Sequence, residues 1–230
     1  MQQPDIATGV VWYVVFVYST VCHEAAHAWT SYKLGDRTAY DGGQVSLDPT
    51  PHIRREPIGM VAVPIINYLL NGSMLGWAHA PYDPEWARRY PVRAAWMAMA
   101  GPLANLLLFL LASILMIVGV KTGVLTPLGL PPSHLVGSAT SSAWDACGEV
   151  LSVAWSLNLT LFVLNMLPLP PLDGSNIPLF FLNGRARDSY QEMIKQPAMA
   201  MIGILVAFRG FQYVAAPVYA QCAVWLFRWM

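Results

Sequence analysis

Four long apolar stretches dominate this 230-residue sequence and restrict the folds that it can adopt. They cover about residues 6–34, 94–120, 143–167 and 198–229. Each has the length of about 20 residues that a helix needs to cross the hydrocarbon of a bilayer. Only 11% of the residues are charged, well below the roughly 25% of an ordinary soluble domain. The sequence therefore predicts an all-α polytopic membrane protein in contact with the lipid bilayer.

Two apolar segments depart from this simple pattern. Arg209 and Pro217 interrupt the fourth stretch, which is therefore either one kinked span or two shorter helices. A fifth apolar run, residues 58–70, contains Pro64 and has the length of a re-entrant segment rather than of a spanning helix. We therefore expect four to six transmembrane helices, with a re-entrant segment between the first two spans.

The loop over residues 35–57 is rich in glycine, proline and aspartate, and alternation within residues 43–47 predicts a short β-strand. Such a membrane-associated strand could pair with an extended peptide by strand addition. There are no internal repeats, so we expect one domain over residues 1–230, with a core over 6–175 and a C-terminal membrane segment over 197–230. The formal net charge is zero, which argues against a nucleic-acid partner.

Polar residues of one motif lie inside the first apolar stretch, in the sequence His23-Glu24-Ala25-Ala26-His27. Charged and imidazole groups are costly in hydrocarbon and usually mark a functional site there. On a helix, positions i and i+4 share one face, so His23 and His27 can bind the same metal ion. Glu24, one position along, can address a water molecule on that metal.

A catalytic zinc ion also needs a third protein ligand. The other histidines, His52, His79 and His134, lie in loop-like segments near prolines. Asp173 is the stronger candidate because it directly follows the third span, in the sequence Leu172-Asp173-Gly174. Three prolines before it end the helix, and the irregular chain can then return a carboxylate to membrane depth inside the protein.

These motifs together resemble the site-2 proteases, a family of intramembrane zinc metalloproteases. His23 to His27 fit HExxH, Gly101-Pro102-Leu103-Ala104-Asn105 fits G-P-x-x-N near the start of the second span, and Asn165 to Gly174 fit N-x-x-P-x-x-x-L-D-G. The motifs occur in the family's order and extend over most of the chain. No inserted PDZ-like or CBS-like domain is apparent, as in the small, minimal members of the family.

The resemblance implies that His23, His27 and Asp173 bind one Zn²⁺ per chain, and that Glu24 is the general base and then the general acid. It implies that Asn105 and Asn165 contact the substrate backbone or the oxyanion, while an interhelical hydrogen bond is the alternative for each. The implied substrate is a transmembrane protein, cleaved within or next to its membrane helix in regulated intramembrane proteolysis. The oligomeric state stays open.

A shared metal site also restricts the topology. His23 and His27 lie in the later half of the first span and Asp173 follows the third, so these two helices must run in the same direction and residues 58–70 cannot cross. Ten basic residues then lie on one face, whereas Lys121 alone lies in the inter-span loops of the other. The ten are Lys33, Arg37, Arg54, Arg55, Arg88, Arg89, Arg93, Arg185, Arg187 and Lys195. The positive-inside rule makes their face cytoplasmic.

We therefore expect a multi-pass protein of a bacterial or archaeal cell membrane, with its N-terminus outside and its active site toward the cytoplasm. Two other functions remain open. A metal-ion transporter or carrier would need further carboxylates along a path, and the spans contain almost none besides Glu24 and Asp173. An inactive protease-like adaptor would tolerate the loss of Glu24. A prenyl-protein-type HExxH membrane protease is a related alternative, but its third ligand would be expected on a helix rather than in a Pro-rich turn. Zinc is also not the only metal that two imidazoles and a carboxylate suit, since cobalt and manganese suit them too.

Overall fold

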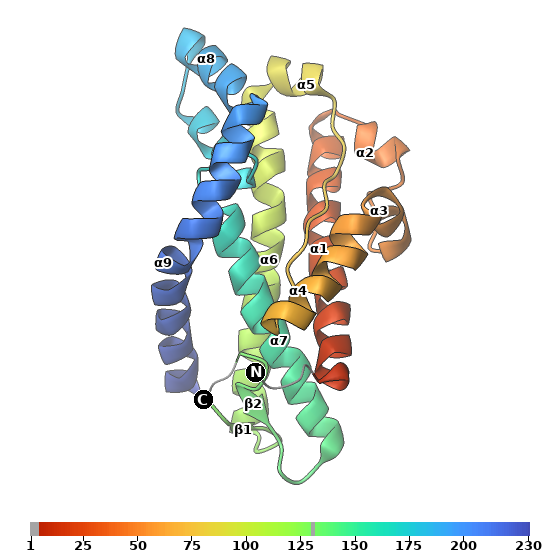
Figure 1. The fold of residues 1–230 in the computed structure, drawn as a ribbon, viewed down its shortest axis with the longest axis vertical. Helices are drawn as coiled ribbons and strands as arrows, with labels where there is room; N and C mark the ends of the chain where they lie inside the picture. The colour runs from red at the N-terminus through yellow and green to blue at the C-terminus, as the bar shows by residue number, and fades with distance from the viewer. Residues whose placement is uncertain (1–4, 130–131) are drawn as a thin grey trace.

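The protein consists almost entirely of helices in the computed structural model, which describes residues 5–129 and 132–230 (Figure 1). Within these residues, four helices are long and apolar enough to cross a membrane: α1 (Ile6–Leu34), α6 (Pro91–Lys121), α7 (Ser142–Asn165) and α9 (Pro197–Trp229). Many of their large apolar side chains are exposed, as contact with lipid requires. The predicted all-α polytopic membrane fold is confirmed, with four candidate spans.

The remaining elements are short and connect the long helices. They are α2 (Thr38–Asp41), α3 (Pro49–Arg55), the π-helix η1 (Ile58–Ala62), α4 (Val63–Asn71), α5 (Pro84–Arg89), β1 (Thr126–Pro127), β2 (Val136–Gly137), the 3₁₀-helix η2 (Asp173–Phe180) and α8 (Gly184–Ile194).

The ends of α1 are set by local chemistry. The Asp5 carboxylate accepts hydrogen bonds from the backbone N–H groups of Ala7 and Thr8, which would otherwise lack partners in the first turn. Gly35 ends the helix in the left-handed conformation, with φ 107°. The helix therefore has the bounds expected for the first span, and it carries the His23 motif in its later half.

The helices α1, α6 and α7 form the bundle, and α9 packs against α7 and α6 from one side (Figure 1). One group of buried apolar side chains joins α1 to α7 and includes Phe16 and Leu157. A second group joins α6, α7 and α9 and includes Trp155 and Met116. The helix α9 is continuous through Pro217 and changes direction midway, so it is a single bent span rather than two pieces.

The segment formed by η1 and α4 follows the predicted re-entrant course. After α4 the chain turns at Gly72, with φ 70°, and runs back in an extended conformation to α5 (Figure 1). The Asp83 N–H donates to the Asp36 carboxylate at 3.0 Å, which holds the returning chain beside the end of α1. The segment therefore enters and leaves at the same end of the bundle.

The prediction of a strand over residues 43–47 is wrong. This segment is curled into turns: the Gln44 N–H donates to the Ala39 carbonyl, and the Ser46 hydroxyl accepts from the Asp48 N–H. Side-chain hydrogen bonds of this kind compete with an extended ladder. In the described residues, the sheet is instead the antiparallel pair β1 and β2 between α6 and α7, with Thr126 opposite Gly137.

Candidate metal centre

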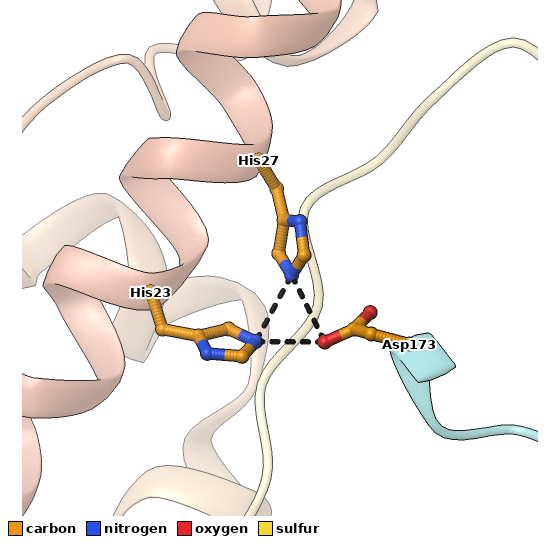
Figure 2. Close-up of side chains that lie close together, drawn as sticks. All are labelled: His23, His27 and Asp173. Carbon is orange, nitrogen blue, oxygen red and sulfur yellow. Dashed lines mark hydrogen bonds and ion pairs between the residues drawn. The ribbon is translucent and has the colours of Figure 1, made fainter. Parts of the chain in front are cut away.

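Three side chains from distant parts of the sequence meet between the spans (Figure 2). His23 and His27 project from α1, and Asp173 is the first residue of η2, shortly after α7. The two histidine Nε2 atoms are 2.9 Å apart, and the Asp173 Oδ2 lies 3.1 Å from Nε2 of His23 and 3.3 Å from Nε2 of His27. The structure thus brings together the three ligands expected from the sequence.

This cluster fits a zinc ion. In a tetrahedral site with bonds of about 2.0–2.1 Å, donor atoms lie roughly 3.3 Å apart. The three observed separations, from 2.9 to 3.3 Å, need only a small expansion to reach this value. Two imidazoles and one carboxylate also leave the fourth position free for water or substrate, as in catalytic zinc sites. No other cluster of potential metal ligands occurs in the described parts of the chain.

Glu24 supplies a second sign of a functional centre. Its side chain is buried, with 4% exposure, and its Oε2 atom has no hydrogen-bond partner among the described residues. Leaving a buried carboxylate oxygen without a donor costs about 1–3 kcal/mol or more. A water molecule activated in the adjacent metal site would provide the donor that this oxygen lacks.

Hydrogen bonds to the far side of each ring orient the two histidines. Nδ1 of His27 lies 2.7 Å from the Met97 carbonyl, which can only accept, so Nδ1 carries the proton and Nε2 is free to bind metal. Nδ1 of His23 lies 2.6 Å from Oδ1 of Asn105. Such outer contacts fix the ring and raise its basicity as a ligand.

The chain between α7 and η2 folds back tightly to deliver Asp173. Gly174 packs so closely on the preceding turn that an added Cβ would lie 2.5 Å from the carbonyl oxygens of Met166 and Leu167. This turn places the Asp173 carboxylate against Nε2 of both histidines, at 3.1 Å from His23 and 3.3 Å from His27.

Gly101 allows α6 to approach the cluster. An added Cβ at this position would lie 2.5 Å from Nε2 of His23 and would also overlap His27. Gly101 lies well inside α6, ten residues after Pro91 where the helix begins. The G-P-x-x-N motif therefore does not mark the helix start: its glycine provides space beside the imidazole rings of His23 and His27.

The two asparagines of the motifs occupy different environments. Asn105 is fully buried and both ends of its amide are hydrogen-bonded inside the protein, which favours the interhelical alternative over a substrate contact. Asn165 ends α7 and is partly exposed, and its side chain has no hydrogen-bond partner within the described residues.

Sequence reasoning missed Asn158, which is buried and bonded to Asn105. Its spacing of seven from Asn165 places both on one face of α7, and this spacing could have identified it. The other histidines lie outside the cluster: His52 contacts the Ser46 carbonyl, and His79 pairs with Glu56.

Comparison with known proteins agrees with this geometry. The chain is 29% identical to "Putative zinc metalloprotease YwhC" of Bacillus subtilis over 166 residues, which are 71% of this chain and 65% of that protein. It is 31% identical to "Putative zinc metalloprotease Rip2" of Mycobacterium tuberculosis over 75% of this chain and 58% of that protein. The chain thus spans less than two thirds of these relatives. No solved structure matches it.

The family model described as "Peptidase family M50" matches residues 11–208. This range contains His23, Glu24, His27 and Asp173. It covers α1 from Val11 to its end, the whole of α6 and α7, and the first part of α9. Because the match covers most of the chain, this multi-pass membrane protein belongs to peptidase family M50, the site-2 protease family.

Proposed function

We propose that this protein is a zinc metalloendopeptidase that cleaves membrane-protein substrates within or next to their transmembrane helices. The observation that carries the proposal is the convergence of His23, His27 and Asp173 within 3.3 Å of one another, beside the buried carboxylate of Glu24 and between membrane-spanning helices. The names of the relatives, as zinc metalloproteases, support the same class of reaction.

The chemistry divides among these residues. His23, His27 and Asp173 hold one zinc ion, which when bound supplies Lewis acidity that activates water and polarises the scissile carbonyl. Glu24 takes a proton from the attacking water and then transfers it to the nitrogen of the breaking peptide bond. The products are a carboxylate and an amine. Asn165, at the end of α7, donates a hydrogen bond to the substrate carbonyl oxygen.

The depth of the site supports a substrate inside the membrane. His23 lies eleven residues before Leu34, where α1 ends. At 1.5 Å per residue, the site is therefore about 16 Å from that end of the helix. This distance from the end of a candidate span supports a cleaved bond at membrane depth, because the hydrocarbon core is about 30 Å thick.

An intact substrate helix hides its carbonyl groups, so the substrate must be extended at the bond that is cleaved. The extended chain between α4 and α5 runs along α1 in Figure 1 and passes beside the labelled histidines in Figure 2. Two backbone N–H groups of this chain have assigned partners within the described residues: Trp77 donates to Gly59 and Asp83 to Asp36. Other backbone groups of this chain are available to pair with an unwound substrate segment by strand addition.

We further propose that the end of the bundle containing α2, α5 and α8 faces the cytoplasm. The basic residues of α5 (Arg88 and Arg89) and of α8 (Arg185 and Arg187) lie at this end, where the re-entrant segment also enters and leaves. The N-terminus would then be outside, but residues 1–4 themselves lie outside the described residues. The active site would open toward the cytoplasmic face.

Purified protein in lipid vesicles, mixed with a labelled library of transmembrane helices, tests the reaction. The native protein should cleave some members within their apolar segments. The Glu24→Gln variant is nearly isosteric and should retain zinc yet lose cleavage, because an amide cannot accept the proton from water. Near-native turnover by this variant would contradict the mechanism. Zinc movement across the vesicle membrane without any cleavage would instead support a carrier.

A further inference from the structure

A chain of buried hydrogen bonds leads from α7 through α6 to the ring of His23. Nδ2 of Asn158 lies 2.9 Å from the Ala154 carbonyl, and Oδ1 of Asn158 lies 2.9 Å from Nδ2 of Asn105. Oδ1 of Asn105 lies 2.6 Å from Nδ1 of His23. Ser19, on α1, joins the network from the side. All of these groups are shielded from solvent, so their hydrogen bonds must be satisfied within the protein.

The direction of every bond in this chain follows from one backbone group. The Ala154 carbonyl can only accept, so the end of the Asn158 amide that faces it must be the NH₂ group. The Asn158 oxygen therefore faces Asn105 and requires a donor there. This leaves the oxygen of Asn105 facing His23, whose Nδ1 must carry the proton. Nε2 of His23 then keeps its lone pair on the side of the metal cluster.

We propose that Asn158 is a positioning residue that, through Asn105, holds His23 in the tautomer whose Nε2 binds the metal. This inference rests on the zinc site of the proposed function and adds a residue that lies outside all three motifs. The two histidines differ in how firmly their outer hydrogen bonds fix the tautomer. His27 bonds to a main-chain carbonyl, which cannot reverse its polarity, whereas His23 bonds to an amide that can.

The need for Asn158 follows from the remaining contacts of Asn105. Without Asn158, the NH₂ group of Asn105 retains only the Ser19 carbonyl at 3.4 Å, a long and weak hydrogen bond. The Asn105 amide could then rotate and present its NH₂ group to His23. That orientation favours the tautomer with the proton on Nε2, which cannot bind metal through this atom.

Zinc affinity and the histidine tautomer test the proposal. The Asn158→Leu variant should bind zinc about 10-fold more weakly in chelator competition, the lower end of the effect of outer contacts on metal sites. In zinc-free protein, ¹⁵N-histidine NMR should show His23 protonated on Nδ1 in the native chain and a mixture of tautomers in the variant. If Asn158→Leu does not fold, the smaller Asn158→Val variant is measured in the same way.

Ser113→Ala provides the matched control. It removes another buried hydrogen bond between the same two helices, from Nε1 of Trp155 to Oγ of Ser113 at 2.9 Å, without touching His23. Zinc affinity and the His23 tautomer should stay at native values in this variant. An equal loss of zinc affinity in Ser113→Ala and Asn158→Leu would show that Asn158 is merely structural and would overturn the proposal.

Testing Asn158→Leu in a second protein background separates the orientation of the Asn105 amide from the packing of the helices. In Asn105→Asp, both side-chain oxygens accept, so the proton stays on Nδ1 of His23 whatever occupies position 158. Asn158→Leu should therefore weaken zinc binding in the native background but not in the Asn105→Asp background. The same loss in both backgrounds, or none in the native one, would refute the relay. Absence of zinc binding by the native protein would instead refute the proposed function.

Discussion

The substitution Gly101→Ala should empty the metal centre while leaving the fold largely intact. The added methyl carbon would lie 2.5 Å from Nε2 of His23, whereas ordinary contacts begin at 3.4 Å. The ring would therefore have to move by about 0.9 Å, several times the ±0.2 Å tolerance of a metal–ligand distance. His27 is displaced as well, so we expect zinc affinity to fall by more than 100-fold, beyond the range for outer contacts.

The loss of folding free energy in Gly101→Ala should be smaller than its loss of zinc-binding free energy. Overpacking in a core costs roughly 1–3 kcal/mol, and alanine recovers about 1 kcal/mol of helix propensity over glycine. Zinc content by mass spectrometry of metals, with chelator competition for affinity, measures the effect. Gly119→Ala is the control, because its methyl group also overpacks the core of the same helix, at 2.6 Å from the buried Leu125 side chain, and meets neither histidine. Full zinc occupancy with native affinity in Gly101→Ala would refute this account of α6.

Three further predictions concern the ligand, the substrate and the topology. Asp173→Ala should lower zinc content well below one per chain, and full occupancy would remove Asp173 from the ligand set. Asn165→Ala should keep its zinc but lower kcat/KM about 10²-fold or more if its amide stabilises the oxyanion; unchanged kinetics would exclude this contact. Cysteines placed at Thr50 and Asp83, in a chain without the native three, should both react only with a cytoplasmic label, and labelling from opposite sides would contradict the re-entrant course.

The spans and the three side chains of the cluster could be predicted from the sequence because strong and local signals encode them. Apolar length alone determines the four candidate spans. The i, i+4 spacing of His23 and His27 defines a shared helix face. The prolines before Asp173 mark the point where the third span must end. Each signal involves a few neighbouring residues and does not depend on tertiary contacts.

Alternation within residues 43–47 suggested a strand, but local hydrogen bonds close the segment into turns: the Gln44 N–H donates to the Ala39 carbonyl, and the Ser46 hydroxyl accepts from the Asp48 N–H. The other features were missed because tertiary contacts decide them. The place of Gly101 depends on how closely α6 approaches α1, which no pattern within α6 reveals. Likewise, an asparagine in an apolar helix can form hydrogen bonds with many different partners. The hydrogen bond that Asn105 donates to Asn158 can therefore be identified only once the packing of the helices is known.

Removing and restoring zinc tests the central claim most directly. Protein stripped of metal by a chelator should not cleave a substrate helix in vesicles. Titration with Zn²⁺ should restore cleavage in proportion to bound metal and saturate at one ion per chain, because His23, His27 and Asp173 form a single site in the described residues. Glu24→Gln should bind the same amount of zinc without recovering activity. Undiminished cleavage by metal-free protein, or saturation with zinc that restores none, would contradict the assignment of this cluster as the catalytic centre.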